Sequence, residues 1–257
     1  MHFTQLFKRR HSLPFFFGAL LLVTATIKWA RATAGESTVP SPKNTALIFD
    51  LDGVVLKKPK IYDPVYKHKA ALAKAAISPA LWANVIKLLS NGAAGGQYQA
   101  LFKKEHPELV TLVNEIMQSK ELMPETVALI QELAAAGYSL HIASNMDASD
   151  FEFFAQKYPE LFSLFKVKKL LTYSTNPEEK PIKKPNHAYF SQLLQELEKQ
   201  GEKKDNLIFI DDLPKNVAAA QETEKEKKAG LSAIVFQNGN QLRQELQERK
   251  ILTAQTH

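Results

Sequence analysis

The sequence predicts an α/β protein with a doubly wound parallel sheet and a helical cap inserted after the first strand. Three observations carry this prediction. Apolar runs of strand length alternate with amphipathic helical stretches through the second half of the chain. Several of these runs end in polar or acidic residues, and the ends of strands are where an open parallel sheet places its chemistry. The first run is followed by a long stretch of helical spacing without strand alternation.

Length and composition fit a globular protein of this class. The 257 residues suit one medium domain with an insertion, or two small domains. A hydrophobic content of 45% and a charged content of 23% allow a sizeable core and argue against wholesale disorder. The chain has no cysteine, which excludes disulfides, thiolate metal sites and cysteine nucleophiles.

Residues 1–34 differ in kind from the rest of the chain. The basic residues 8–10 precede an apolar run over residues 13–27, and alanines follow it. This layout predicts a secretory signal peptide and hence an exported protein, either periplasmic or secreted. Lys28 and Arg31 near the end of the run keep an uncleaved membrane anchor as an alternative, and a leader on a cytoplasmic protein is the other.

The net charge of +6 is largely a property of this leader. The remainder is close to balanced and shows no basic stripe with interleaved aromatic residues, so nucleic acid is not an expected partner. A membrane is expected as a partner only through residues 1–34. Residues 35–44, which contain two prolines and several hydroxyl side chains, are expected to form a linker.

The first predicted strand ends in two carboxylates. Asp50 and Asp52 follow the apolar residues 47–49, and Gly53 comes next. Because strand side chains alternate, the spacing of two places both carboxylates on one side of the strand end. Two close carboxylates repel each other unless a cation or a shared proton relieves them. This stretch therefore predicts a metal site.

Residues 58–120 are expected to form the helical cap, because helical spacing dominates there. The glycine-rich residues 91–96 interrupt the pattern. A helix pair is expected after this break, at about 97–105 and 107–119. The catalytic core is then expected to comprise residues 45–57 and 121–257.

Helices and strands alternate after the cap. Pro124 is expected to open a helix with Val127, Ile130, Leu133 and Ala134 on its buried face. Further strands are expected at 138–143, 167–171, 207–210 and 232–236. Further helices are expected at 149–158, from 159 onward, at 186–201, from 214 onward, and at 241–248.

Polar groups lie at three of the predicted strand ends, and their order along the chain resembles the motif order of a known family. Four elements of the sequence are similar to the four motifs of the haloacid dehalogenase-like (HAD) hydrolase superfamily. They are Asp50-x-Asp52-Gly53, a strand ending in Ser144, Lys184-Pro185, and a strand ending in Asp211-Asp212. The resemblance covers about residues 45–240. The insertion lies between the first two motifs, which is its place in the helical-cap subgroup of the family.

This resemblance implies roles for the carboxylates. Asp50 would be the nucleophile that forms an aspartyl-phosphate, and Asp52 would be the acid/base that protonates the leaving oxygen and later activates water. The expected cofactor is Mg²⁺. Its ligands would be the Asp50 carboxylate, the Asp52 backbone carbonyl and Asp212, with Asp211 assisting. The alternative for Asp211 is a purely structural role, in which it caps the following helix.

The resemblance also implies groups around the phosphate. Ser144 would hydrogen-bond a phosphoryl oxygen, with the backbone near Asn145 helping. Lys184 would neutralise the charge on the nucleophile and the phosphoryl group, with Lys183 as the neighbouring alternative. Asn216 lies where many relatives carry a residue that supports the site.

The expected function is hydrolysis of a small phosphorylated metabolite. Family dehalogenases lack an aspartate at the position of Asp52, so the resemblance favours phosphoryl transfer over carbon–halogen cleavage. A phosphomutase on the same core and a non-catalytic binding protein of the same fold are the alternatives. No motif indicates the substrate or the oligomeric state.

Overall fold

The computed structural model describes residues 40–58, 67–68, 102–103, 107–170, 181–202, 205–227 and 230–253. The chain divides into two units, Met1–Val39 and Pro40–His257, and every described residue belongs to the second. The predicted signal or anchor segment, residues 35–39 of the linker and most of the predicted cap lie outside the described residues. No helix within the described ranges combines the length and the apolar character that a membrane span requires.

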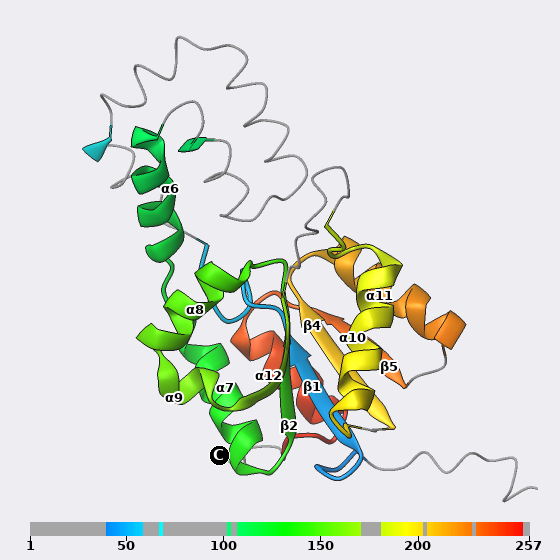
Figure 1. Ribbon diagram of the computed structural model, residues 1–257. Coiled ribbons are helices and arrows are strands. Elements are labelled where there is room, and N and C mark those ends of the chain that lie inside the picture. Colours follow the sequence, from blue (N-terminus) through cyan, green and yellow to red (C-terminus); the bar gives the residue numbers. More distant parts are fainter. Residues whose placement is uncertain are drawn as a thin grey trace, which may run out of the picture. The chain divides into compact units, whose positions relative to one another are not determined.

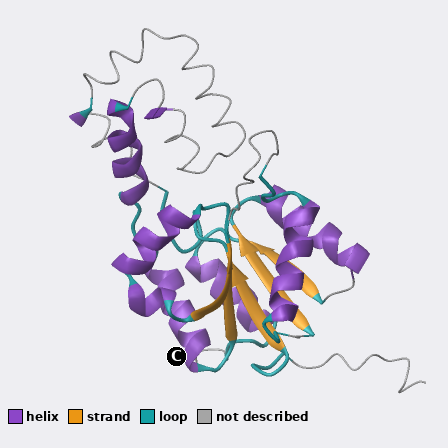
Figure 2. Cartoon of the chain, in the orientation of Figure 1, coloured by secondary structure: helices purple, strands orange, loops and turns teal. Residues whose placement is uncertain are grey.

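The core of the second unit is a parallel sheet of five strands in the described residues, in the order β3-β2-β1-β4-β5 (Figure 1, Figure 2). The strands are β1 (Thr45–Phe49), β2 (Ser139–Ala143), β3 (Phe165–Lys169), β4 (Asn206–Asp211) and β5 (Leu231–Val235). The strand order runs outward from β1 in both directions, so the predicted doubly wound α/β fold is confirmed. β3 begins earlier than predicted, because the alternation of buried and exposed side chains already starts at Phe165.

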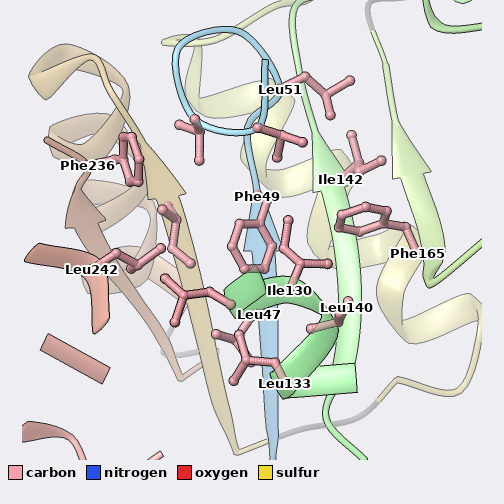
Figure 3. Packing of buried hydrophobic residues seen from close by; sticks show 14 of the residues in the cluster. Leu47, Phe49, Leu51, Ile130, Leu133, Leu140, Ile142, Phe165, Phe236 and Leu242 are labelled. Atoms are coloured by element: carbon pink, nitrogen blue, oxygen red, sulfur yellow. The ribbon is translucent and has the colours of Figure 1, made fainter. Parts of the chain in front are cut away.

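Side chains of β1 alternate between two hydrophobic clusters, one on each face of the sheet. Leu47 and Phe49 belong to the first cluster and Ile48 to the second, and all three are fully buried. Figure 3 shows the first cluster, in which Phe49 lies near Ile130, with Leu133 below. A strand buried on both faces reads as a continuous apolar run, which is why the sequence identified β1 so clearly.

Helices cover both faces of this sheet. Helices α7 (Pro124–Ala135), α8 (Ala148–Lys157), α9 (Pro159–Phe162) and α12 (Gly239–Glu248) supply residues to the first cluster, and α10 (His187–Lys199) and α11 (Pro214–Lys227) supply the second. Asn186 caps α10 as predicted, since its side chain accepts a hydrogen bond from the Ala188 N–H.

The buried face of α7 is wider than predicted. Thr126 and Leu129 are buried together with the predicted Ile130 and Leu133, and the predicted Val127 and Ala134 are half-buried and pack against the first cluster. The ridge with i, i+3, i+4 and i+7 spacing that starts at Thr126 faces the sheet. The sequence pattern did not indicate this ridge, because its first residue is a threonine and not an apolar residue.

The predicted cap leaves and re-enters the core through two segments that pair with each other. Leu56 and Leu122 form an antiparallel bridge, and the Lys57 N–H donates to the Glu121 carbonyl at 2.7 Å. Helix α6 (Glu108–Gln118) precedes the returning segment and contacts α8 (Figure 1). The ends of the predicted cap therefore lie side by side, next to the loop that follows β1.

Candidate active site

The polar groups predicted at strand ends meet at the carboxyl edge of the sheet. β1 lies between β2 and β4, so Asp50, Ser144 and Asp211 come together at the ends of three adjacent strands. After Asp50 the chain turns at Gly53, whose φ is +83°. A Cβ atom at Gly53 would overlap the carboxylate of Asp212, so this position requires glycine both for its backbone conformation and for the close approach.

Three carboxylates converge at this edge. Oxygen atoms of Asp50, Asp211 and Asp212 all lie within 4.8 Å of one another. Burial raises the pKa of Asp50 to about 7; Lys184 opposes this rise, while Asp211 and Asp52 add to it. Burial likewise raises the pKa of Asp212. Hard carboxylate oxygens in this arrangement fit Mg²⁺, which would favour their ionised forms.

Lys184 lies among these carboxylates. Its Nζ is 2.6 Å from Asp211 Oδ2 and 2.9 Å from Asp50 Oδ1, and it also donates to the Ala143 carbonyl at 2.8 Å. Burial opposes the charged ammonium, but Asp50 and Asp211 outweigh it and raise the pKa of Lys184. The structure thus brings the predicted Lys184 into contact with the predicted nucleophile.

Asp211 is held from several sides. Besides Lys184, the Asn216 side chain donates to both Asp211 oxygens, at 2.9 and 3.0 Å, and the Leu213 N–H donates to Oδ1 at 2.9 Å. The predicted support by Asn216 therefore acts on Asp211, and the contact with Leu213 holds the turn between β4 and α11. The neighbouring Asp212 is half-buried and pairs at 3.4 Å with the well-exposed Lys58. Asp212 is accordingly the more accessible of the two carboxylates.

Ser144 is buried where β2 ends. Its Oγ accepts a hydrogen bond from the Met146 N–H at 3.3 Å. The hydroxyl of Tyr189 lies 3.1 Å from the Ser144 carbonyl and 2.7 Å from the Lys169 carbonyl. Tyr189 thus joins the ends of β2 and β3 beside the site. No signal in the sequence pointed to this role, because a tyrosine on the apolar face of a helix is typical of a core residue.

Asn145 is turned toward the loop that carries Lys184. Its Oδ1 accepts from the Lys184 N–H at 2.9 Å, and its Nδ2 donates to the Lys184 carbonyl at 3.1 Å. The side chain therefore positions Lys184, whereas the predicted contribution of the backbone near Asn145 to phosphate binding stays a prediction.

Asp52 has a partner that the sequence did not indicate. The Lys120 Nζ lies 2.7 Å from Asp52 Oδ1, although the two residues are 68 positions apart. The Lys120 side chain is 3% exposed and that of Asp52 is 44% exposed. A lysine just after the end of a helix normally indicates a solvated residue, so only the packing of the chain shows this ion pair.

A further buried carboxylate, Asp150, stands near this pair. Asp150 Oδ2 is buried without a hydrogen-bond partner among the described residues. Burial raises the pKa of Asp150 to about 6; Asp147 and Asp52 add to the rise, and Lys120 opposes it. Lys120 is thus close enough to both Asp52 and Asp150 to act on each of them electrostatically.

The substitution Asp150→Asn is expected to stabilise the protein at neutral pH. The folded pKa lies above the ordinary value, so the folded protein loses stability as the pH rises through about 4 to 6 and the carboxylate ionises in a buried place. Removing the charge should raise the free energy of unfolding by about 1–2 kcal/mol at pH 8 and change it little at pH 4. Denaturant unfolding at the two pH values measures this difference. Glu152→Gln, an exposed position on the same helix, is the matched control, and a gain of equal size at both pH values would contradict the explanation.

Comparisons with known proteins place this geometry in a family. A family model described as haloacid dehalogenase-like hydrolase matches residues 45–222, which is more than half of the chain. A search among curated proteins found no match.

Solved structures of similar fold include a HAD family enzyme from Bacteroides thetaiotaomicron. It is 16% identical with a TM-score of 0.52, over 76% of this chain and 95% of that one. An aspartate-to-alanine mutant of that enzyme, in complex with magnesium and inorganic phosphate, is 15% identical with a TM-score of 0.51 over the same shares of the two chains. A hydrolase from Streptococcus pneumoniae is 18% identical with a TM-score of 0.47, over 79% of this chain and 98% of that one. At these identities the similarity shows the fold alone.

Proposed function

The chain belongs to the haloacid dehalogenase-like hydrolases, and from this premise we propose that it is a Mg²⁺-dependent phosphomonoesterase. The proposed mechanism forms an aspartyl-phosphate on Asp50, and the proposed substrate is a small phosphorylated metabolite. The observation that carries the proposal is the buried Asp50 carboxylate, held 2.9 Å from Lys184 beside Asp211 and Asp212.

The donor set supports Mg²⁺ as the cofactor. Asp50 and Asp212 would supply carboxylate oxygens and Asp52 its backbone carbonyl, with Asp211 assisting. The magnesium and phosphate bound to the Bacteroides thetaiotaomicron enzyme support the same choice. When bound, the ion would offset the repulsion between these carboxylates and a phosphate dianion.

In the first half of the proposed reaction, a carboxylate oxygen of Asp50 attacks phosphorus while the bond from phosphorus to the leaving oxygen breaks. Asp52 gives its proton to that leaving oxygen, so the product departs as an alcohol. Lys184 faces Asp50 and would neutralise negative charge on the nucleophile and the phosphoryl group. Ser144 would donate its hydroxyl proton to a phosphoryl oxygen.

In the second half, Asp52 takes a proton from water, and the resulting hydroxide attacks phosphorus. The bond between phosphorus and the Asp50 oxygen breaks, inorganic phosphate leaves, and both aspartates return to their starting states. The presence of Asp52 supports phosphoryl transfer over carbon–halogen cleavage, because the leaving alkoxide of a phosphomonoester needs a proton and a halide does not.

A panel of phosphomonoesters, assayed with the full chain, tests the proposal. Release of inorganic phosphate is expected in the presence of Mg²⁺. It should fall by at least about 100-fold in EDTA and return when Mg²⁺ is added in excess, because the ion carries several kcal/mol of charge stabilisation. Phosphate release that is indifferent to EDTA would argue against the metal. Halide release from haloacids without phosphate release from any ester would replace the proposal with dehalogenation.

A further inference from the structure

Lys120 stands between the predicted cap and the proposed acid/base. It follows α6 and precedes the segment that pairs with Leu56 on its return to the core. Its ammonium group is buried and lies 2.7 Å from Asp52 Oδ1. A buried lysine is uncommon and needs a partner of opposite charge, so the contact with Asp52 fixes the position of this ammonium group.

We propose that Lys120 is a positioning residue, which fixes the side chain of Asp52 in the orientation that proton transfer requires. This inference rests on the proposed function, in which Asp52 is the acid/base. It also couples the proton-transfer group to α6, since a displacement of this helix would move Lys120 and with it the Asp52 carboxylate.

The contacts of Asp52 show why its side chain needs such a partner. Its backbone is fixed, because Asp52 forms a bridge with Leu56 and the Gly53 N–H donates to the Leu56 carbonyl at 2.8 Å. The carboxylate itself is half-exposed, and Lys120 is its one hydrogen-bond partner among the described residues. Without Lys120, nothing in the described part of the chain would keep Asp52 in a single orientation.

The surroundings of Lys120 show why it can serve this purpose. Asp150 on α8 lies near enough for Lys120 to lower its pKa, so the ammonium is attracted from the side of α8 as well as from Asp52. Helix α6 contacts α8, which keeps the segment that carries Lys120 against the core. The Asp52 carboxylate stays 44% exposed in this ion pair, so it is held in place and still open to a reacting group. A role in orienting Asp52 therefore fits the arrangement, besides any contribution of the pair to stability.

The substitution Lys120→Met tests the proposal through the leaving group. An alkyl phosphate needs a proton on its leaving oxygen, whereas p-nitrophenyl phosphate has a leaving group that departs without one. K120M is expected to lower kcat/KM by about 10- to 100-fold for an alkyl phosphate and by less than about 3-fold for p-nitrophenyl phosphate, because misplacing a catalytic group by about 1 Å costs about 100-fold. Asp52→Asn should show the same split, larger in size.

Lys57→Met is the matched control. Lys57 lies on the same pair of segments, but it is half-exposed and its ion pair is with Glu121, at 4.0 Å. K57M is expected to leave kcat/KM unchanged for both substrates. Thermal unfolding of K120M checks that it is folded. Should it not fold, Lys120→Gln takes its place in the same comparison, since the amide keeps polarity while shortening the reach.

The outcomes separate this inference from the proposed function. Equal losses with both substrates, or no loss with either, would overturn the positioning role while the wild-type activity still supports the phosphatase. A wild-type protein without Mg²⁺-dependent phosphatase activity would overturn the proposed function, and the positioning role with it.

Discussion

Replacing Asp50 with asparagine is expected to abolish the phosphatase activity and to leave the protein folded. The amide cannot attack phosphorus, so kcat should fall by at least about 10⁴-fold, as expected when a nucleophile is removed. The free energy of unfolding should change by less than about 1 kcal/mol, because burial already penalises the charged form of Asp50 and Lys184 keeps Asp211 as its partner. Steady-state phosphate release and denaturant unfolding provide the two measurements.

Asp205→Asn is the control for Asp50→Asn. Asp205 is an exposed aspartate just before β4, and its replacement should alter neither quantity. Rapid acid quenching of the wild-type reaction, followed by mass spectrometry, should find phosphate on the peptide that contains Asp50. An Asp50→Asn variant that keeps a substantial part of the wild-type rate would exclude this residue as the nucleophile.

Replacing Lys184 with methionine is expected to cause the largest loss of stability among these substitutions. The change leaves Asp50 and Asp211, both buried, without the cation that contacts them at 2.9 and 2.6 Å. Breaking a buried ion pair from one side typically costs about 3–5 kcal/mol, and the loss should be full at pH 8. It should shrink at pH 5, because Asp50 has a raised pKa and binds a proton there in place of its ion pair.

Denaturant unfolding at pH 5 and pH 8 measures the effect, and Lys183→Met serves as the neighbouring control. Lys183 is only partly buried, so its replacement should cost much less. Mg²⁺ should stabilise K184M more than the wild type, since a divalent cation can supply part of the missing charge. A Lys184→Met variant as stable as the wild type at pH 8 would show that these carboxylates do not depend on the lysine.

The elements that the sequence predicted best are those whose signal is local. β1 was recognisable from a continuous apolar run, and the start of α10 from the capping Asn186. The strand ends could be marked because Asp50, Ser144 and Asp211 follow such runs directly. The predicted face of α7 does pack in or against the first cluster, but the pattern missed Thr126, because polarity alone does not show which way a helix is rotated on a sheet. The boundaries of the predicted cap stay a prediction, since most of it lies outside the described residues.

The fold class, the family resemblance and the residues at the strand ends follow from the amino-acid order, because strand period, turn glycines and caps depend on neighbours along the chain. The partners of these residues are visible only in the folded chain. Lys184 is held by Asn145, and Asp52 is paired with Lys120 across 68 positions. Such pairs escape a sequence pattern because the energy of a charged group depends on its burial and on partners brought from distant segments. Burial and partners are both fixed when the helices pack against the sheet, and neither can be predicted from the local sequence pattern.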